Sequence, residues 1–292
     1  MLELIRWTIE FGLVAGTIIL TFAQGLDIPL GHLAFFREHL GLLLRSLVAV
    51  VVLVPVAALL VIFLVRPTPA VAVGMVILAA CPAAPQMIVS IPKAGGKLAY
   101  VTSLHLTLGV LSIITTPLTL ALLADALNFR ASVHPYVIAE QVGTSLLIPL
   151  LLGMLFLAGF PRAAIAIRKP LAFIGQAINF LPIAIILIMR YHFLLQMDFR
   201  SYSAMAIMIV IALGIGHFLS PRRQHEERTT LALESAARHP GLAFIIAVLN
   251  FSLDKALPVF IPYLVLFVVI SMLYIQLRKR TVTLGNLNKV SK

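Results

Sequence analysis

Long apolar runs separated by short polar segments follow one another along the whole chain. A helix needs about 20 apolar residues to cross the hydrocarbon core of a bilayer, and about nine runs here are long enough. The predicted spans lie near residues 6–24, 42–65, 69–92, 97–125, 134–159, 170–190, 202–219, 229–251 and 256–277. This pattern predicts an all-α integral membrane protein with about nine transmembrane helices.

Two of these runs are interrupted by residues that break helices. In "LAACPAAPQMIVSIPKAGG", Pro82 and Pro85 each remove a backbone donor and clash with the preceding turn. In "ESAARHPGLAFIIAVLN", Pro240 disfavours helical geometry at His239, and Gly241 tolerates the conformation that follows. Irregular backbone at membrane depth is tolerated only where protein buries it or where it lines a wet cavity. We therefore expect both breaks to lie inside the protein.

The two interrupted spans occupy corresponding places in the chain and are predicted to cross the membrane in opposite directions. Such a pair is typical of secondary transporters built from inverted repeats, whose broken helices cross near the midplane and form the binding site. Two ordinary proline kinks are the alternative interpretation.

The second interruption also contains charged side chains at a depth where charge is costly. Glu234, Arg238 and His239 lie within this span, and insertion scales place the cost of a central charged residue at about 2.5–3.5 kcal/mol. Because ionisable groups inside membranes are usually functional, we expect a substrate or coupling site here. Glu234 and Arg238 would share one helical face if the turn before Pro240 stayed helical. A buried network with a purely structural role is the alternative.

Composition supports the membrane assignment and predicts an orientation. Of the 292 residues 61% are hydrophobic and 11% are charged, whereas a soluble domain averages about 25% charged residues. Fifteen of the 22 Lys and Arg residues fall on the side of the C-terminus and six on the other side. The positive-inside rule therefore predicts a multi-pass protein of the cell (inner) membrane with an external N-terminus and a cytoplasmic C-terminus. This orientation accounts for the net charge of +11 without a nucleic-acid partner.

The segments "GMVILAACPAAPQMIVSIPKAGGKLAY" and "RTTLALESAARHPGLAFIIA" carry a resemblance to a known family. The first has a Cys-Pro-small-small break and an Ala-x-Gly turn, and the second has Thr-x-x-x-Glu followed by Gly-Leu-Ala. In this order and spacing they make the chain similar to the bile acid:sodium symporter family over residues from about 6 to 277.

The resemblance implies a single membrane domain with two parts and a particular kind of substrate. A core with the crossing broken helices would rock against a smaller panel and carry organic anions into the cell with sodium. Carried onto this chain, the membrane domain spans residues 1–280, with a core at about 40–125 and 201–280, a panel at about 5–30 and 133–195, and a basic cytoplasmic tail at 281–292.

The positions that would bind sodium in the family have lost most of their oxygen ligands. Glu234 is retained, but a Gln-Asn pair of the family is Arg238-His239 here. The remaining expected ligands fall on Val50, Met87, Ile88, Val101 and His105. Hard cations require oxygen ligands, which hydrocarbon side chains do not offer. We therefore expect proton-coupled or uncoupled transport, with Arg238 as a resident cation that neutralises Glu234.

Other polar residues of the spans are candidates for coupling and for the substrate path. The resemblance places His105 opposite Glu234, where a histidine beside a carboxylate can carry a coupling proton; a histidine bonded to a freed backbone carbonyl is the alternative. A substrate path and interhelical hydrogen bonding are both compatible with Gln86, Glu140, Gln141, Gln176 and Asn179.

Three other functions remain open from the sequence. Cys81 in the first break makes arsenite-type efflux an alternative, and a sensor that binds without transport is another. Glu234, His105 and His239 together suggest an intramembrane metal or enzyme site, although Arg238 would repel a metal ion. Because no HExxH, GxSxG or phosphate-loop motif is present, we expect no catalysis, no cofactor and no metal.

Overall fold

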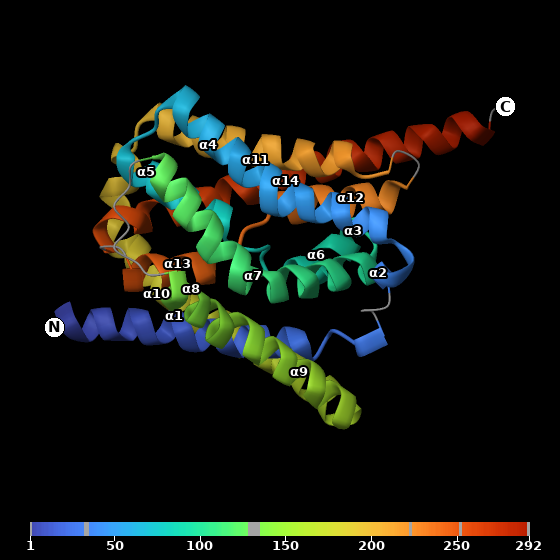
Figure 1. Cartoon of the computed structure of the whole chain (residues 1–292), viewed down its shortest axis with the longest axis horizontal. Coiled ribbons are helices and arrows are strands. Elements are labelled where there is room, and N and C mark those ends of the chain that lie inside the picture. The colour runs from blue at the N-terminus through green and yellow to red at the C-terminus, as the bar shows by residue number, and fades with distance from the viewer. Residues whose placement is uncertain (1, 32–34, 128–134, 222–223, 251–252, 291–292) are drawn as a thin grey trace.

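The computed structural model describes residues 2–31, 35–127, 135–221, 224–250 and 253–290 and is all-helical in these ranges. Most helices run along the long axis of the molecule, and the two chain ends lie at opposite ends of that axis (Figure 1). In chain order the elements are α1 (Leu2–Gly25), α2 (Phe35–Glu38), α3 (Leu40–Leu47), the π-helical segment η2 (Val48–Leu53), α4 (Val54–Val65), α5 (Pro69–Ala80), α6 (Met87–Lys93), α7 (Leu98–Ala126), α8 (Pro135–Val142), the π-helical segment η3 (Gly143–Leu147), α9 (Ile148–Gly159), α10 (Pro161–Gln196), α11 (Phe199–Leu219), α12 (His225–Ala236), α13 (Pro240–Asn250) and α14 (Leu253–Val290).

Helices occupy every predicted span within the described residues, but their lengths differ from the prediction. Five are long and apolar enough to cross a membrane, at 40–65, 98–126, 135–159, 199–219 and 259–279. Two further apolar helical stretches, at 11–25 and 69–80, are shorter. α10 and α14 extend beyond their predicted spans, and α14 stays helical to Val290, so residue 280 is not the end of a helix.

Two spans contain π-helical turns that the apolar pattern did not reveal. η2 comes directly before α4, whose second residue is Pro55, and η3 comes directly before α9, whose second residue is Pro149. Proline has no backbone N–H, and its ring clashes with the carbonyl four residues earlier. A wider turn avoids this clash, and such bulges are a common cause of bends inside long helices.

The two predicted helix breaks are present, and they contact each other. α5 ends at Ala80 and α6 begins at Met87, whereas α12 ends at Ala236 and α13 begins at Pro240. The backbone N–H of His239 donates to the carbonyl of Pro82 at 2.9 Å, which joins the two irregular segments. In Figure 1 the α5–α6 pair and the α12–α13 pair run in opposite directions.

The helices pack in two groups that meet at α13. α1 packs mainly against α10 and α9 along the lower part of Figure 1, whereas α11 packs against α4, α12 and α14 in the upper part. The α1–α9 contact depends on Gly25 and Gly153, because a Cβ atom added to Gly153 would lie 2.2 Å from the carbonyl oxygen of Phe22. Small residues allow this close approach of membrane helices. α13 contacts α1 from the first group and α14 and α5 from the second.

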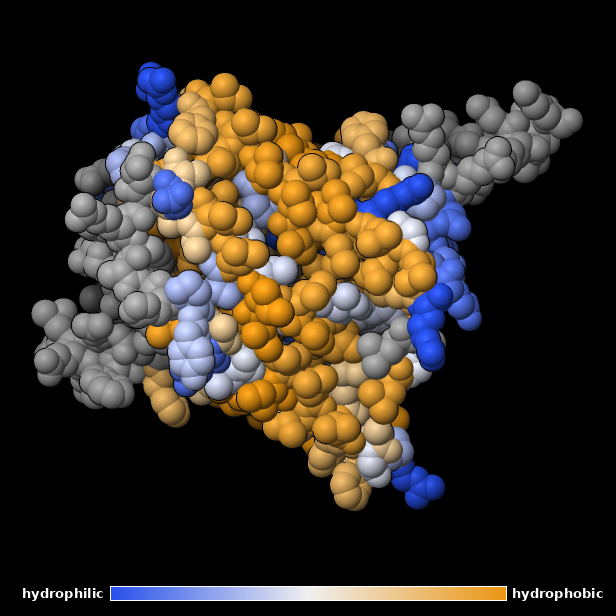
Figure 2. Space-filling model, in the orientation of Figure 1, coloured by the Kyte–Doolittle hydropathy of each residue, from blue (hydrophilic) through white to orange (hydrophobic). Residues whose placement is uncertain are grey.

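The surface has the character expected of a protein surrounded by lipid. In Figure 2 hydrophobic residues cover a broad band across the middle, and hydrophilic residues gather towards the right edge. Large apolar side chains such as Ile114, Leu64 and Phe218 are exposed, the last two at 82%. A soluble monomer rarely exposes so large a contiguous apolar area.

The charge bias leads to a direct test of orientation. A reporter fused after Lys292 should be active only in the form that reports the cytoplasm, because positive loops stay on that side. The same reporter inserted between residues 128 and 134, on the predicted outer side, should give the opposite signal. External activity at the C-terminus would show that the number of spans is wrong.

Candidate functional site

Arg238 lies where the two broken helices meet and donates to carbonyl oxygens at both helix ends. Its side chain is buried, with Nη1 3.1 Å from the Cys81 carbonyl oxygen and Nη2 2.7 Å from the Ser235 carbonyl oxygen. The last carbonyls of a helix have no donor within the helix. Tyr263 Oη donates to a third such carbonyl, that of Ala236, at 3.0 Å. One guanidinium therefore satisfies backbone groups of both breaks.

The predicted ion pair between Arg238 and Glu234 is wrong. Helix α12 ends at Ala236, and Ala237 is extended, with φ −69° and ψ 132°. The turn that would have placed both side chains on one face is therefore absent. Among the described residues these two side chains form no ion pair, so Arg238 does not neutralise Glu234 by direct contact; its charge faces backbone carbonyls instead.

Glu234 is paired with His105, as the resemblance suggested. His105 comes from α7 and Glu234 from α12, and Nδ1 of the histidine lies 3.2 Å from Oε1 of the carboxylate. Both side chains are buried, and Glu234 is completely inaccessible. Glu234 Oε2 has no hydrogen-bond partner among the described residues. The imidazole and the carboxylate can therefore share a proton out of contact with water.

Three other positions expected to bind sodium contain buried hydrocarbon. Val50, Ile88 and Val101 are each at most 3% exposed. Val50 lies in η2 and lines a small cavity of about 20 Å³ together with Cys81 and Arg238. None of the three side chains has an oxygen atom, so they do not fit the family's sodium ligands.

His239 caps the second half-helix. Its Nδ1 accepts a hydrogen bond from the backbone N–H of Leu242 at 3.1 Å, which places the proton of a neutral imidazole on Nε2. Nε2 is buried and has no partner among the described residues. Pro240 occupies the first helical position, where its missing N–H costs nothing. Gly241 allows close approach of α1, since an added Cβ would lie 2.7 Å from Thr17 Oγ1.

A cavity of about 300 Å³ adjoins the N-terminus of α13. Its polar lining residues are Gln86, Gln176, Asn179, Arg238 and His239. Gln86 Nε2 donates to Gln176 Oε1 at 3.2 Å, and the side-chain oxygen of Asn179 is buried without a partner among the described residues. Three of the five residues of the predicted substrate path thus line one cavity.

The remaining two residues of that path lie elsewhere. Glu140 and Gln141 belong to α8, and neither contributes to the lining of this cavity. The alternative metal site is not assembled either: across the described ranges no group of three His, Cys, Asp or Glu side chains could hold a metal ion.

The cavity combines cationic and donor groups with an apolar wall. Arg238, the Nε2–H of His239 and the N-terminus of α13 all favour a negative charge, because the N-terminus of a helix carries partial positive charge. Leu20, Phe180 and other apolar side chains form the rest of the wall. Its volume falls at the lower end of typical small-molecule sites, so it suits a small organic acid.

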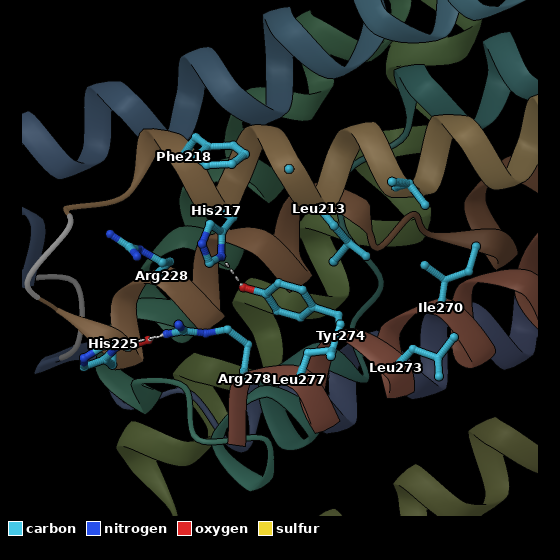
Figure 3. Close-up of a pocket in the computed structure, with 12 residues that line it drawn as sticks. Leu213, His217, Phe218, His225, Arg228, Ile270, Leu273, Tyr274, Leu277 and Arg278 are labelled. Carbon is cyan, nitrogen blue, oxygen red and sulfur yellow. Dashed lines mark hydrogen bonds between the residues drawn. The ribbon is translucent and has the colours of Figure 1, made fainter. Parts of the chain in front are cut away.

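A second, larger cavity lies apart from the breaks and was not found from the sequence. It has a volume of about 700 Å³ between α11, α12 and α14 (Figure 3). It shares no lining residue with the cavity at α13.

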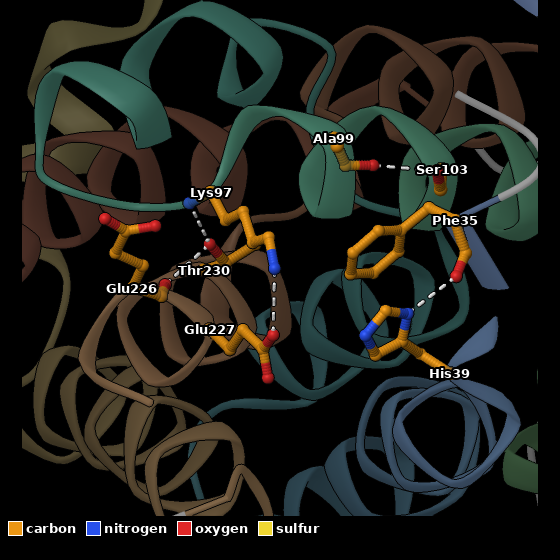
Figure 4. A network of polar contacts seen from close by, with 8 residues as sticks. All are labelled: Phe35, His39, Lys97, Ala99, Ser103, Glu226, Glu227 and Thr230. Carbon is orange, nitrogen blue, oxygen red and sulfur yellow. Dashed lines mark hydrogen bonds and ion pairs between the residues drawn. The ribbon is translucent and has the colours of Figure 1, made fainter. Parts of the chain in front are cut away.

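A polar cluster near the start of α12 was also missed (Figure 4). The backbone N–H of Lys97 donates to Thr230 Oγ1 at 2.8 Å, and Lys97 Nζ lies 3.3 Å from Glu227 Oε1. The same ammonium lies 4.9 Å from the ring centre of Phe35, which stacks on His39. These contacts tie the start of α7 to α12. Because these residues are far apart in the sequence, their spacing does not indicate that they are in contact.

Comparison with known proteins identifies one family. The model of a family described as "Sodium Bile acid symporter family" matches residues 14–216, which is more than half of the chain. The match includes the first broken helix and stops before the second. No curated protein matches the chain.

Proposed function

The chain belongs to the sodium bile acid symporter family and is therefore a multi-pass membrane transporter rather than an enzyme, and we propose that it moves a small organic anion without sodium. The observation that carries the proposal is the cavity of about 300 Å³ at the N-terminus of α13. Half-helix N-termini bind the anionic groups of substrates in transporters with broken helices.

The contacts of Arg238 support a mechanism that does not use sodium. In transporters with broken helices, carbonyls of the unwound segments commonly coordinate the coupling ion. Here the carbonyls of Cys81 and Ser235 accept hydrogen bonds from a guanidinium that is part of the chain. The buried His105–Glu234 pair offers a place for a proton instead, because an imidazole nitrogen and a carboxylate oxygen lie 3.2 Å apart there.

The position of the cavity supports movement of one helix group against the other. Its lining includes Leu20 of α1 and Gln176 of α10 on one side, and residues of α13 and α14 on the other. Relative movement of these groups would open the cavity to one side of the membrane and close it to the other, as in the rocking of a core against a panel. By contrast, Cys81 lies on the small cavity and not on this one, which argues against arsenite as the substrate.

A substitution in the cavity tests the binding site. Gln176→Leu replaces the amide by a shorter apolar side chain and removes the partner of Gln86, so a polar group is left without its hydrogen bond. Because this hydrogen bond is exposed, losing it costs about 0.5–1.5 kcal/mol, and we expect KM to rise roughly two- to tenfold. Gln141→Leu, outside the cavity, should leave KM unchanged.

The assay is counterflow of labelled small carboxylic acids in proteoliposomes, with and without sodium. The expected result is exchange of at least one acid without sodium. Strict dependence on sodium would contradict the proposal. Saturable binding of an acid without any exchange would instead indicate a sensor.

A further inference from the structure

The cavity of about 700 Å³ between α11, α12 and α14 has a basic end and an apolar wall. It lies near the C-terminal end of α11 and the start of α12 (Figure 3). Its basic end is formed by His217, His225, Arg228 and Arg278. Its apolar wall is lined by Val210, Leu213, Phe218, Ile270, Leu273 and Leu277.

The basic end has no acidic side chain among the described residues that line the cavity. On α12 itself, Glu227 is engaged by Lys97 (Figure 4), and Glu226 is exposed outside the lining. Arg228 forms no ion pair with any described residue, and its Nε is buried without a partner. A ligand with a negative charge could therefore form an ion pair with the guanidinium of Arg228.

Hydrogen bonds hold the other polar side chains in place around Arg228. His217 Nδ1 and Tyr274 Oη lie 2.9 Å apart and join α11 to α14. Arg278 Nη2 donates to the carbonyl oxygen of His225 at 3.1 Å and joins α14 to α12. Three helices thus contribute to one fixed basic site. Arginine is well suited to phosphate because its planar guanidinium can donate two parallel hydrogen bonds.

The apolar wall continues into the lipid-facing surface. Val210, Leu273 and Leu277 line the cavity and are themselves exposed, each by more than half. A ligand that fits both ends must therefore carry a negative head and a hydrocarbon tail. Within a membrane such molecules are anionic phospholipids, and basic pockets between transmembrane helices bind their headgroups.

We propose that this cleft binds an anionic phospholipid, with its phosphate at Arg228 and Arg278 and an acyl chain along α11 and α14. The lipid connects α12, the first half of a broken helix, to α14. Bound lipid therefore stabilises the folded state by mass action. On the predicted orientation the site faces the cytoplasmic leaflet. The proposal does not depend on the substrate or on the coupling ion.

Gly214 provides a test that leaves every charge unchanged. It lines the cavity, and an added Cβ would meet no atom within 4 Å. Gly214→Leu should therefore fill the space of the acyl chain without disturbing the helix packing. A second variant, Arg228→Gln with Arg278→Gln, removes the headgroup contacts. Its control, Arg162→Gln with Lys169→Gln, removes the same net charge from exposed positions of α10.

The measurement is the melting temperature of the purified full-length protein in detergent, titrated with phosphatidylglycerol or with phosphatidylcholine. Phosphatidylglycerol should raise the melting temperature of the wild type and of the α10 control to the same extent, whereas phosphatidylcholine should not. Both Gly214→Leu and the double arginine variant should weaken apparent binding at least tenfold.

Several outcomes would overturn the proposal. Equal stabilisation by phosphatidylglycerol and phosphatidylcholine would do so, as would unchanged lipid binding by Gly214→Leu. A loss of lipid binding in the α10 control as large as that in the double arginine variant would indicate nonspecific attraction of charge. Glycerol phosphate, which has no acyl chain, should not stabilise the wild type. If it does so as well as the lipid, the ligand is a soluble anion. If the double arginine variant fails to fold, the comparison of the two lipids on the wild type and the lipid binding of Gly214→Leu still test the proposal.

Discussion

Arg238→Gln should abolish transport and lower the melting temperature of the protein. The shorter amide cannot reach both the Cys81 and the Ser235 carbonyls, which accept from the guanidinium at 3.1 and 2.7 Å. A buried carbonyl without a donor costs about 1–3 kcal/mol. We expect a loss of transport of at least tenfold, which corresponds to about 1.4 kcal/mol. Counterflow and thermal unfolding of the purified variant measure the two effects.

The response of the Arg238→Gln variant to added sodium tests the role of the guanidinium more directly. Although Arg238→Gln restores a residue type that the family resemblance implies, Val50, Ile88 and Val101 still provide no oxygen ligands. Added sodium should therefore not rescue the variant. Arg45→Gln, which removes an exposed guanidinium from α3, should retain both stability and transport. Full transport by Arg238→Gln, or its recovery in sodium, would show that the guanidinium is not a resident cation.

Replacing His105 by glutamine should remove the response of transport to a proton gradient. If His105 and Glu234 share the coupling proton, wild-type uptake rises with an inward proton gradient and collapses when a protonophore is added. Glutamine keeps a hydrogen-bonding group beside Glu234 but cannot carry the proton, so exchange without a gradient should persist. Uptake into proteoliposomes at two pH values measures this response, and uptake that is strictly sodium-dependent and insensitive to pH would contradict the hypothesis.

Double-mutant cycles compare the coupling energy of His105 and Glu234 with that of Glu234 and Arg238. His105 and Glu234 are in contact at 3.2 Å, and residues in contact typically show coupling energies of about 0.5–3 kcal/mol. Glu234 and Arg238 make no direct contact, so their cycle should give a smaller value. The free energies of unfolding of His105→Gln, Glu234→Gln, Arg238→Gln and the two double variants provide both numbers.

The sequence predicted those features of the fold that depend on local chemistry. The breaks at Pro82, Pro85 and Pro240 were predictable because proline removes a donor wherever the chain places it. The contact of His105 with Glu234 followed from the family resemblance rather than from spacing. The family itself is confirmed by the match to residues 14–216.

Features that depend on packing were not predictable in this way. Pro55 and Pro149 were visible, but a proline alone does not determine whether a helix bends, breaks or widens into a π-helical turn. The Glu234–Arg238 pair was predicted wrongly because helix α12 ends at Ala236, two residues before the arginine. The cleft beside Arg228 was missed because α11, α12 and α14 contribute to it jointly, and no single segment shows it.

The contact between the two breaks also limits how the protein can move. Arg238 donates to the carbonyl of Cys81, just after α5, and to that of Ser235 in α12, and the backbone N–H of His239 donates to the carbonyl of Pro82. Separating the breaks would sacrifice hydrogen bonds in a medium with no water to replace them. The four half-helices therefore have few independent degrees of freedom and should travel as one rigid body. An exchange between outward and inward forms would then cross one shared energy barrier, with no intermediate in which only one broken helix has moved.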